Sequence, residues 1–317
     1  MTEATMPERV DQSTCAAENS RSRNVWCIVR CASLALLLGA CTYGLDTVPN
    51  VQPLRSAPIM SYSEYAALTH DEPYVLNLRT SEGSLLYFGS RHTTDPANAQ
   101  IDSIVALWHA FQPTVALAES RKARRGSMNT GVKTFGESAV PVSLAREADI
   151  PVYTFEPPLE SEIAALLPSW SKERLLLFYI LRSYTARAIS RRSDGQAREL
   201  IRDRGEWPGL EGAIPSLSAM DSIWRIEFPE GPGWRELPWQ ATWPTGSESW
   251  LNEISAAVNR VRDQYMVAVI ANLVARGERV FAVVGSSHVV MQEPTLRELI
   301  TPGVSALKVH TFESPRL

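Results

Sequence analysis

Residues 280–288 read VFAVVGSSH, an apolar run that ends in glycine and is followed by a histidine three residues later. Residues 84–92, SLLYFGSRH, repeat this pattern nearly two hundred residues earlier. Short apolar runs of this length are typical of strands that are buried on both faces of a sheet. Further runs of the same kind occur at 74–79 (YVLNLR), 114–118 (TVALA), 152–155 (VYTF) and 307–312 (LKVHTF).

Helical patterns separate most of these strands. A helix is expected to begin at Asp95-Pro96, residues 160–203 have a helical pattern, and 249–276 carry an amphipathic stripe. Strands that alternate with helices predict an α/β fold with a mostly parallel sheet flanked by helices. Residues 205–250 contain six Trp, six Pro and six Gly, so we expect an irregular excursion there. The whole stretch 160–250 would be an insertion in, or a cap over, an α/β domain that spans 73–317.

Composition excludes several classes of function. The chain has 317 residues, with 31 Lys and Arg against 35 Asp and Glu, so it lacks the cationic excess of a nucleic-acid-binding protein. The last of its four cysteines is Cys41. The body of the protein therefore has no disulfide, no thiolate metal site and no cysteine nucleophile.

The N-terminal region resembles the export signal of a bacterial lipoprotein. Residues 31–40 form an apolar run that is short for a membrane span but suits a signal peptide, and arginines precede it. The run ends in Leu38-Gly39-Ala40-Cys41, which looks like a lipobox. The resemblance implies a signal peptide at 1–40 and an acylated Cys41, followed by a tether at 41–72. Thr42 in place of Asp implies the outer membrane, with the domain facing the periplasm.

Four polar residues follow four of the predicted strands. His92 and His288 each lie three residues past a glycine, while Glu119 and Glu156 come directly after their strands. Because a ligand crevice lies at the carboxyl ends of parallel strands, we expect these side chains to meet there. Two imidazoles with carboxylates suit either a divalent metal (Mn, Co, Zn or Fe) or metal-free acid–base catalysis.

Two further features bear on this site. Arg262 lies at the edge of the stripe on helix 249–276, where it either covers apolar surface or reaches the crevice and holds an anion. The basic run at 121–125 is more typical of a solvated loop than of an anion site. Neither His92 nor His288 has an adjacent serine in the G-x-S-x-G pattern of a nucleophile elbow, so this kind of serine hydrolase is excluded.

These blocks together resemble the TraB/GumN/Tiki proteins, within the wider superfamily of erythromycin esterases and ChaN-like lipoproteins. The similar stretches are 87–96 (YFGSRHTTDP), 114–120 (TVALAES), 151–160 (PVYTFEPPLE) and 259–289, which ends in the second G-x-x-H. The family usually has Arg-Asn where this chain has Arg262-Asp263, which leaves one hydrogen-bonding position open.

The resemblance implies a membrane-anchored envelope hydrolase, either a metal-dependent protease-like or an esterase-like enzyme, that acts on a peptide or ester. His92, Glu119 and His288 would bind a metal or transfer protons, and Glu156 and Arg262 would support them. In the absence of a metal, His92 would be the general base, oriented by a glutamate. The alternative is a ChaN-like lipoprotein that binds haem or a metal without turnover.

Overall fold

The computed structural model describes residues 42–51, 58–246 and 248–300, and it has the predicted α/β architecture. Its main sheet has five strands in the order β2-β3-β7-β4-β6. Strands β3, β7, β4 and β6 are parallel, and β2 is an antiparallel edge strand joined to β3 as a hairpin. The bounds of these strands are Tyr74–Arg79 (β2), Ser84–Ser90 (β3), Val115–Ala118 (β4), Val152–Thr154 (β6) and Arg279–Gly285 (β7).

The register of the parallel strands brings their carboxyl ends to one edge. Ser90 of β3 pairs with Gly285 of β7, and Ala118 of β4 pairs with Val283 of β7. Thr154 of β6 in turn pairs with Ala118. The residues that follow the four strands therefore emerge side by side, as the sequence predicts.

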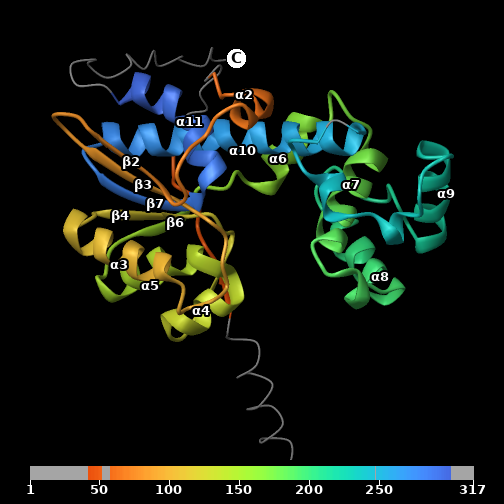
Figure 1. Cartoon of the computed structure of the whole chain (residues 1–317), viewed down its shortest axis with the longest axis horizontal. Helices are drawn as coiled ribbons and strands as arrows, with labels where there is room; N and C mark the ends of the chain where they lie inside the picture. The colour runs from red at the N-terminus through yellow and green to blue at the C-terminus, as the bar shows by residue number, and fades with distance from the viewer. Residues whose placement is uncertain (1–41, 52–57, 247, 301–317) are drawn as a thin grey trace, which may run out of the picture. The chain divides into compact units, whose positions relative to one another are not determined.

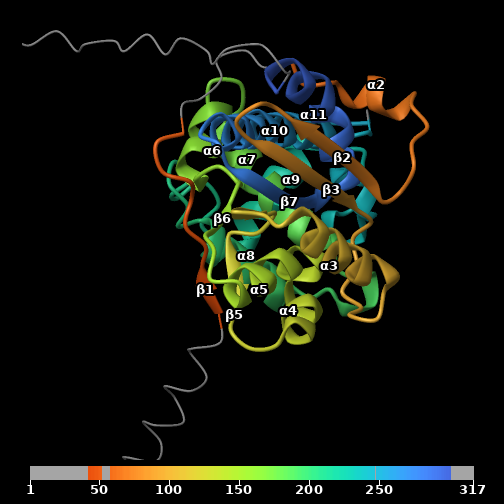
Figure 2. The same ribbon diagram turned by 90° about the vertical axis from the view of Figure 1, so that its left-hand side faces the viewer.

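Helices cover both faces of the sheet (Figures 1 and 2). On one face lie α10 (Trp250–Ala275) and α11 (Ser286–Leu299), and on the other lie α3 (Ala99–Phe111), α4 (Met128–Phe135) and α5 (Ala139–Glu147). Alternate residues of a strand point to opposite faces. Leu85 therefore packs in the cluster that includes the α10 side chains, and Phe88 packs in the cluster formed with α3 and α5.

A further apolar cluster is formed by the stretch 160–203, which the sequence predicts to be helical, the segment that follows it, and the first half of α10. The seven residues Leu175–Leu181 of α7 are all buried, as their continuous apolar pattern predicts. The helices here are α6 (Leu159–Leu166), α7 (Lys172–Thr185), α8 (Asp194–Arg204) and α9 (Leu217–Glu227), with 3-10 turns η2 (Ile189–Arg191), η3 (Trp234–Glu236) and η4 (Trp239–Thr242).

Two predicted local structures are wrong. Residues 205–250 are not irregular throughout, because α9 forms in a stretch that lacks Pro and Gly and is capped by Ser216. Helix α3 does not begin at Asp95-Pro96. Its N-cap is Asn98, whose side chain accepts a hydrogen bond from the backbone of Gln100, while the Asp95 side chain instead closes a turn by accepting from the Ala97 N–H at 3.0 Å.

The segment predicted as a tether has local structure. It contains β1 (Thr42–Gly44), which shares a small sheet with β5 (Lys122–Arg124), and α2 (Tyr62–Ala66). Val48 is buried, and Glu72 accepts a hydrogen bond from Ser286 Oγ at 2.9 Å. The described residues from Tyr43 onward form one compact unit.

Some predictions concern residues that the structure does not describe. The signal peptide, Cys41 and the predicted strand at 307–312 all lie outside the described residues. Within the described ranges, no helix has the length and apolar character needed to cross a membrane.

Candidate functional site

A cavity of about 540 Å³ lies at the carboxyl ends of the parallel strands. Four of the five predicted site residues line it, namely His92, Glu119, Arg262 and His288. The fifth, Glu156, lies behind Arg262 and lines an adjoining cavity. Side chains of α2 and η4, including Tyr62 and Trp239, complete the wall, so both the predicted tether and the Trp-rich segment contribute to this cavity.

Glu119 is held at the centre of the site by donors on both carboxylate oxygens. Its Oε1 accepts a hydrogen bond from Arg262 Nη2 at 2.7 Å, and its Oε2 accepts from the backbone N–H of Gly285 at 2.9 Å. Burial raises the pKa of Glu119, but His288, Arg262 and His92 outweigh burial and hold this pKa well below its ordinary value. The side chain is therefore a fixed anion rather than a proton donor.

Arg262 joins the two predicted glutamates. It donates from Nε to Glu156 Oε2 at 2.8 Å and from Nη1 to Asn259 Oδ1 at 2.7 Å, and Nη2 contacts both Glu156 Oε1 and Glu119. The guanidinium is buried in the middle of α10, and such an ion is stable only when it is paired and hydrogen-bonded. The sequence left open whether Arg262 covers apolar surface or reaches the crevice, and in the structure its side chain reaches the crevice.

His92 is oriented by a glutamate that the sequence did not identify. Its Nδ1 lies 2.7 Å from Oε1 of Glu137, a residue of the 3-10 turn η1 (Gly136–Ser138) that is only 2% exposed. Glu137 also accepts from Ser90 Oγ at 2.8 Å and from the Thr93 N–H at 2.9 Å. The hydrogen bond to Glu137 raises the pKa of His92 from 6.5 to about 9. Because the His92 side chain is 70% exposed, water weakens its longer-range charge interactions, and the direct bond dominates.

The free nitrogen of His92 points toward the end of β7. A Cβ added to Gly285 would lie 2.9 Å from His92 Nε2 and 3.9 Å from Glu119 Oε2. An added methyl group could be accommodated only if the imidazole moved, so the close approach of His92 favours glycine at this strand end.

His288 forms the second imidazole–carboxylate pair. Its Nδ1 lies 2.5 Å from Asp263 Oδ1, and its Nε2 lies 3.7 Å from Glu119 Oε1. Gln292 also donates to Asp263 Oδ1 at 2.7 Å. Burial lowers the pKa of His288, but Asp263 and Glu119 outweigh burial and raise it above 6.5.

His288 lies in the first turn of α11 and is 6% exposed. Asp263 replaces the Asn of the resembled family, and here it directly holds the histidine. The structure thus fills the hydrogen-bonding position that the sequence left open.

In this structure the predicted metal ligands are bound to other groups of the chain. Both oxygens of Glu119 are occupied by N–H donors, and one of those donors belongs to the buried cation Arg262. Among the residues that the structure describes, no group of three or more His, Cys, Asp or Glu is arranged to hold a metal.

The residues missed from the sequence, Glu137 and Asp263, carry weak local signals. Glu137 follows no strand and lies in a short 3-10 turn, so only the tertiary contact with His92 identifies it. Asp263 is a fully buried charge on the apolar side of α10, and an acidic residue inside such a stripe is a usable signal.

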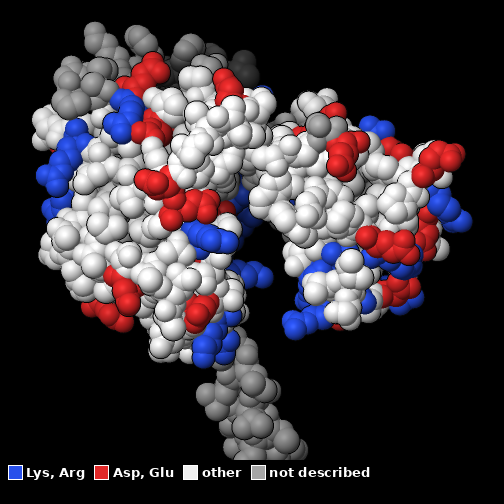
Figure 3. All heavy atoms as spheres, viewed as in Figure 1, with Lys and Arg blue, Asp and Glu red and all other residues white. Residues whose placement is uncertain are grey.

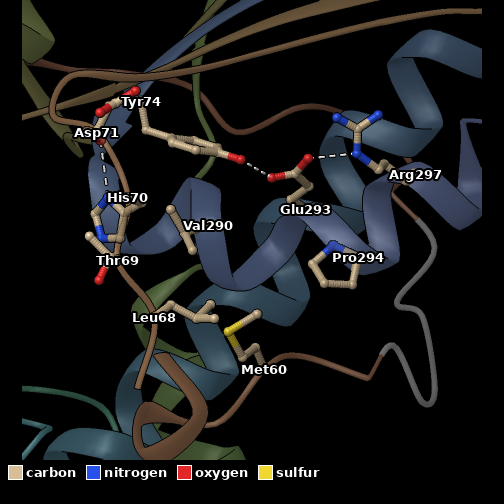
Figure 4. Close-up of a pocket in the computed structure, with 10 residues that line it drawn as sticks. All are labelled: Met60, Leu68, Thr69, His70, Asp71, Tyr74, Val290, Glu293, Pro294 and Arg297. Carbon is tan, nitrogen blue, oxygen red and sulfur yellow. Dashed lines mark hydrogen bonds and ion pairs between the residues drawn. The ribbon is translucent and has the colours of Figure 1, made fainter. Parts of the chain in front are cut away.

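A different cavity, of about 590 Å³, lies between the 58–74 segment and α11 (Figure 4). Its polar side chains bind one another, because Tyr74 and Arg297 both donate to Glu293. It contains none of the predicted site residues.

On the face drawn in Figure 3, acidic and basic side chains lie next to each other beside a hollow in the surface. At the candidate site, Arg262 is paired with two glutamates, His92 with Glu137 and His288 with Asp263. Comparison of the chain with protein-family models, with curated proteins and with solved structures found no match.

Proposed function

We propose that this protein is a hydrolase that cleaves an ester or amide bond without a metal, with His92 as the general base. The observation that carries the proposal is the convergence of two carboxylate-bound imidazoles on Glu119 inside one cavity. A carboxylate on Nδ1 fixes the tautomer and leaves Nε2 to accept a proton. The sequence resemblance to TraB/GumN/Tiki proteins and erythromycin esterases is in keeping with this chemistry.

In the proposed reaction, water is the nucleophile. Among the described side chains, no serine hydroxyl is hydrogen-bonded to Nε2 of either histidine, and Ser90 and Ser286 donate to glutamates instead. His92 Nε2 takes a proton from water as the water oxygen bonds to the substrate carbonyl carbon. Collapse of the tetrahedral intermediate breaks the bond to the leaving oxygen or nitrogen, which receives that proton from His92.

The developing oxyanion would be held at the N-terminus of α11. The first N–H groups of a helix have no intrahelical acceptor, and no side chain among the described residues caps α11. Gly285, Ser286 and Ser287 at this end all line the cavity. Backbone N–H groups and the helix dipole favour negative charge there, and loss of one such donor typically costs about 10²–10³ in rate.

We propose further that the protein is anchored to the bacterial outer membrane through an acylated Cys41. The lipobox in the sequence supports this localisation. We expect Cys41→Ser to abolish labelling with fatty acid and to leave uncleaved precursor in the membrane fraction. Continued cleavage and labelling of the variant would contradict the anchor.

The hydrolase proposal is tested by substituting the two histidines. We expect His92→Ala and His288→Ala each to reduce hydrolysis of a responsive ester or peptide substrate by about 10²–10⁴. The double variant should be scarcely worse, because members of one catalytic unit act non-additively. His109→Ala, on the exposed side of α3, is the matched control and should retain full activity.

Three outcomes would contradict the proposal. If both histidines are only structural, the variants keep activity, and their losses of stability add to within about 0.5 kcal/mol. Loss of activity on dialysis against a chelator, restored by Zn or Mn, would indicate a metal-dependent enzyme. A Soret band in the purified protein, without turnover of any ester or amide, would indicate the haem-binding alternative.

A further inference from the structure

A second, smaller cavity of about 230 Å³ adjoins the candidate site. Arg182 and Arg262 line both cavities, so the two cavities share these side chains as part of their walls. Four arginines and two glutamates line the smaller one: Arg121, Arg182, Arg204, Arg262, Glu156 and Glu162. Its lining therefore carries two more positive than negative charges.

The two glutamates already have partners. Arg121 Nη2 lies 2.7 Å from Glu162 Oε2, and Glu156 is bound by Arg262. Tyr179 also donates to Glu162 at 2.7 Å. These pairs leave Arg182 and Arg204 as the cations that are not neutralised by a carboxylate of the cavity.

Arg182 has no hydrogen bond or ion pair with any described residue. It lies near the end of α7, between residues of a buried core. Burial, together with the nearby charge of Arg262, lowers the pKa of Arg182. Glu162 and Glu156 partly offset this effect but make no hydrogen bond or ion pair with Arg182, so the guanidinium of this half-buried residue keeps unused donors for an anion.

Arg204 is also incompletely paired. Its Nη2 donates to Ser183 Oγ at 2.7 Å, and its Nη1 contacts Asp203, whose side chain is 70% exposed and which does not line the cavity. Its buried Nε has no partner among the described residues. Two guanidinium groups with unused donors thus face one small polar space.

We propose that this cavity binds an oxyanion, a carboxylate or phosphate group, between Arg182 and Arg204. The planar guanidinium forks match the geometry of such oxygens and can bind them through paired hydrogen bonds. The volume exceeds the roughly 30 Å³ that one water occupies in the liquid, so a small anion fits. The anion is either free or an acidic substituent of a molecule bound in the larger cavity.

Inorganic phosphate is the probe for the site itself. At constant ionic strength, we expect phosphate to bind saturably in titration calorimetry and to raise the melting temperature relative to chloride, as expected for a ligand of the folded state. Arg182→Met should weaken phosphate binding about tenfold or more, and Arg182→Lys should weaken it less. Arg182→Met should also melt no lower than wild type without phosphate, because it removes a half-buried charge that has no ion pair.

Arg187→Met is the matched control, because it removes the same charge from the exposed residue just after α7. Phosphate affinity that is unchanged in Arg182→Met, or weakened equally in Arg187→Met, would overturn the proposal. His92→Ala should bind phosphate like wild type, so a failure of the hydrolase proposal does not affect this test.

The source of the anion is distinguished with paired esters, and this arm rests on the proposed hydrolysis. One ester carries a terminal carboxylate and the other is its neutral counterpart. A preference for the acidic ester that is lost in Arg182→Met but kept in Arg187→Met assigns the cavity to a substrate group. Equal turnover of both esters, with phosphate binding intact, assigns it to a free oxyanion.

Discussion

The imidazole of His92 is bound through Nδ1 to Glu137, and this bond raises its pKa to about 9. Only the neutral imidazole can accept a proton from water at Nε2. We therefore expect kcat/KM to rise with pH and to level off only above the pKa of His92. In Glu137→Gln the carboxylate is gone, so the pKa of His92 should fall toward 6.5 and the rising limb should move to lower pH.

The measurement is the pH profile of kcat/KM for both proteins. Glu147→Gln, at an exposed position of α5, removes the same charge elsewhere and should leave the profile unchanged. If the rising part of the kcat/KM profile does not move in Glu137→Gln, a group other than His92 is responsible for this pH dependence.

The contacts of single residues explain why the sequence predicted part of this site and missed the rest. His92, Glu119, Glu156 and His288 follow strands, and the shared edge of a parallel sheet makes such residues predictable. Glu137 reaches His92 from a 3-10 turn 45 positions away in sequence. No local pattern encodes that contact, because it depends on how α4 and α5 pack under the sheet.

At the scale of secondary-structure elements, the end of β7 and the start of α11 form the most constrained part of the site. Gly285 has a φ of −60°, which any residue can adopt, so its requirement comes from space alone. A methyl group at this position would lie 2.9 Å from His92 Nε2.

We expect Gly285→Ala to displace the His92 imidazole and to reduce the hydrolytic rate about 100-fold, as small misplacements of a catalytic group do. The assay is kcat/KM at a pH above the pKa of His92. Gly233→Ala is the control, because nothing lies within 4 Å of the added methyl and its φ of −61° is equally ordinary. Equal activity of the two variants would show that the position of His92 tolerates the methyl group.

The errors in the predicted secondary structure also arise at the level of single elements. The Pro and Gly residues and most of the Trp residues of 205–250 lie in the flanks of α9, and eleven consecutive residues without Pro or Gly suffice for a helix. The start of α3 was misplaced because both Asp95 and Asn98 are good helix caps, and only the fold decides between them. Long apolar strands were predicted almost to the residue, since burial on both faces leaves few alternatives.

At the scale of the whole molecule, α10 connects two apolar cores. Ile254 in its first half belongs to the cluster with α7 and α8, while Ile270 in its second half packs against the sheet. Arg262 lies between these two residues and carries the ion pairs of the site. The geometry of the candidate site thus depends on both cores being folded at once.

This arrangement predicts that the compact unit unfolds in one cooperative step. Ile254→Ala and Ile270→Ala remove the same atoms from the same helix, and each side chain is fully buried. Each should cost about 2–5 kcal/mol in the free energy of unfolding. Seven of the nine tryptophans lie between 170 and 250, so fluorescence reports mainly on the helical core, which is the cluster that α10 forms with α7 and α8. Far-UV circular dichroism reports on both apolar cores. If α10 couples the cores, both substitutions shift the denaturation midpoints of both signals together, as two-state unfolding requires. A fluorescence transition that moves in Ile254→Ala but not in Ile270→Ala would mean that the helical core unfolds separately and that the site can open without loss of the sheet.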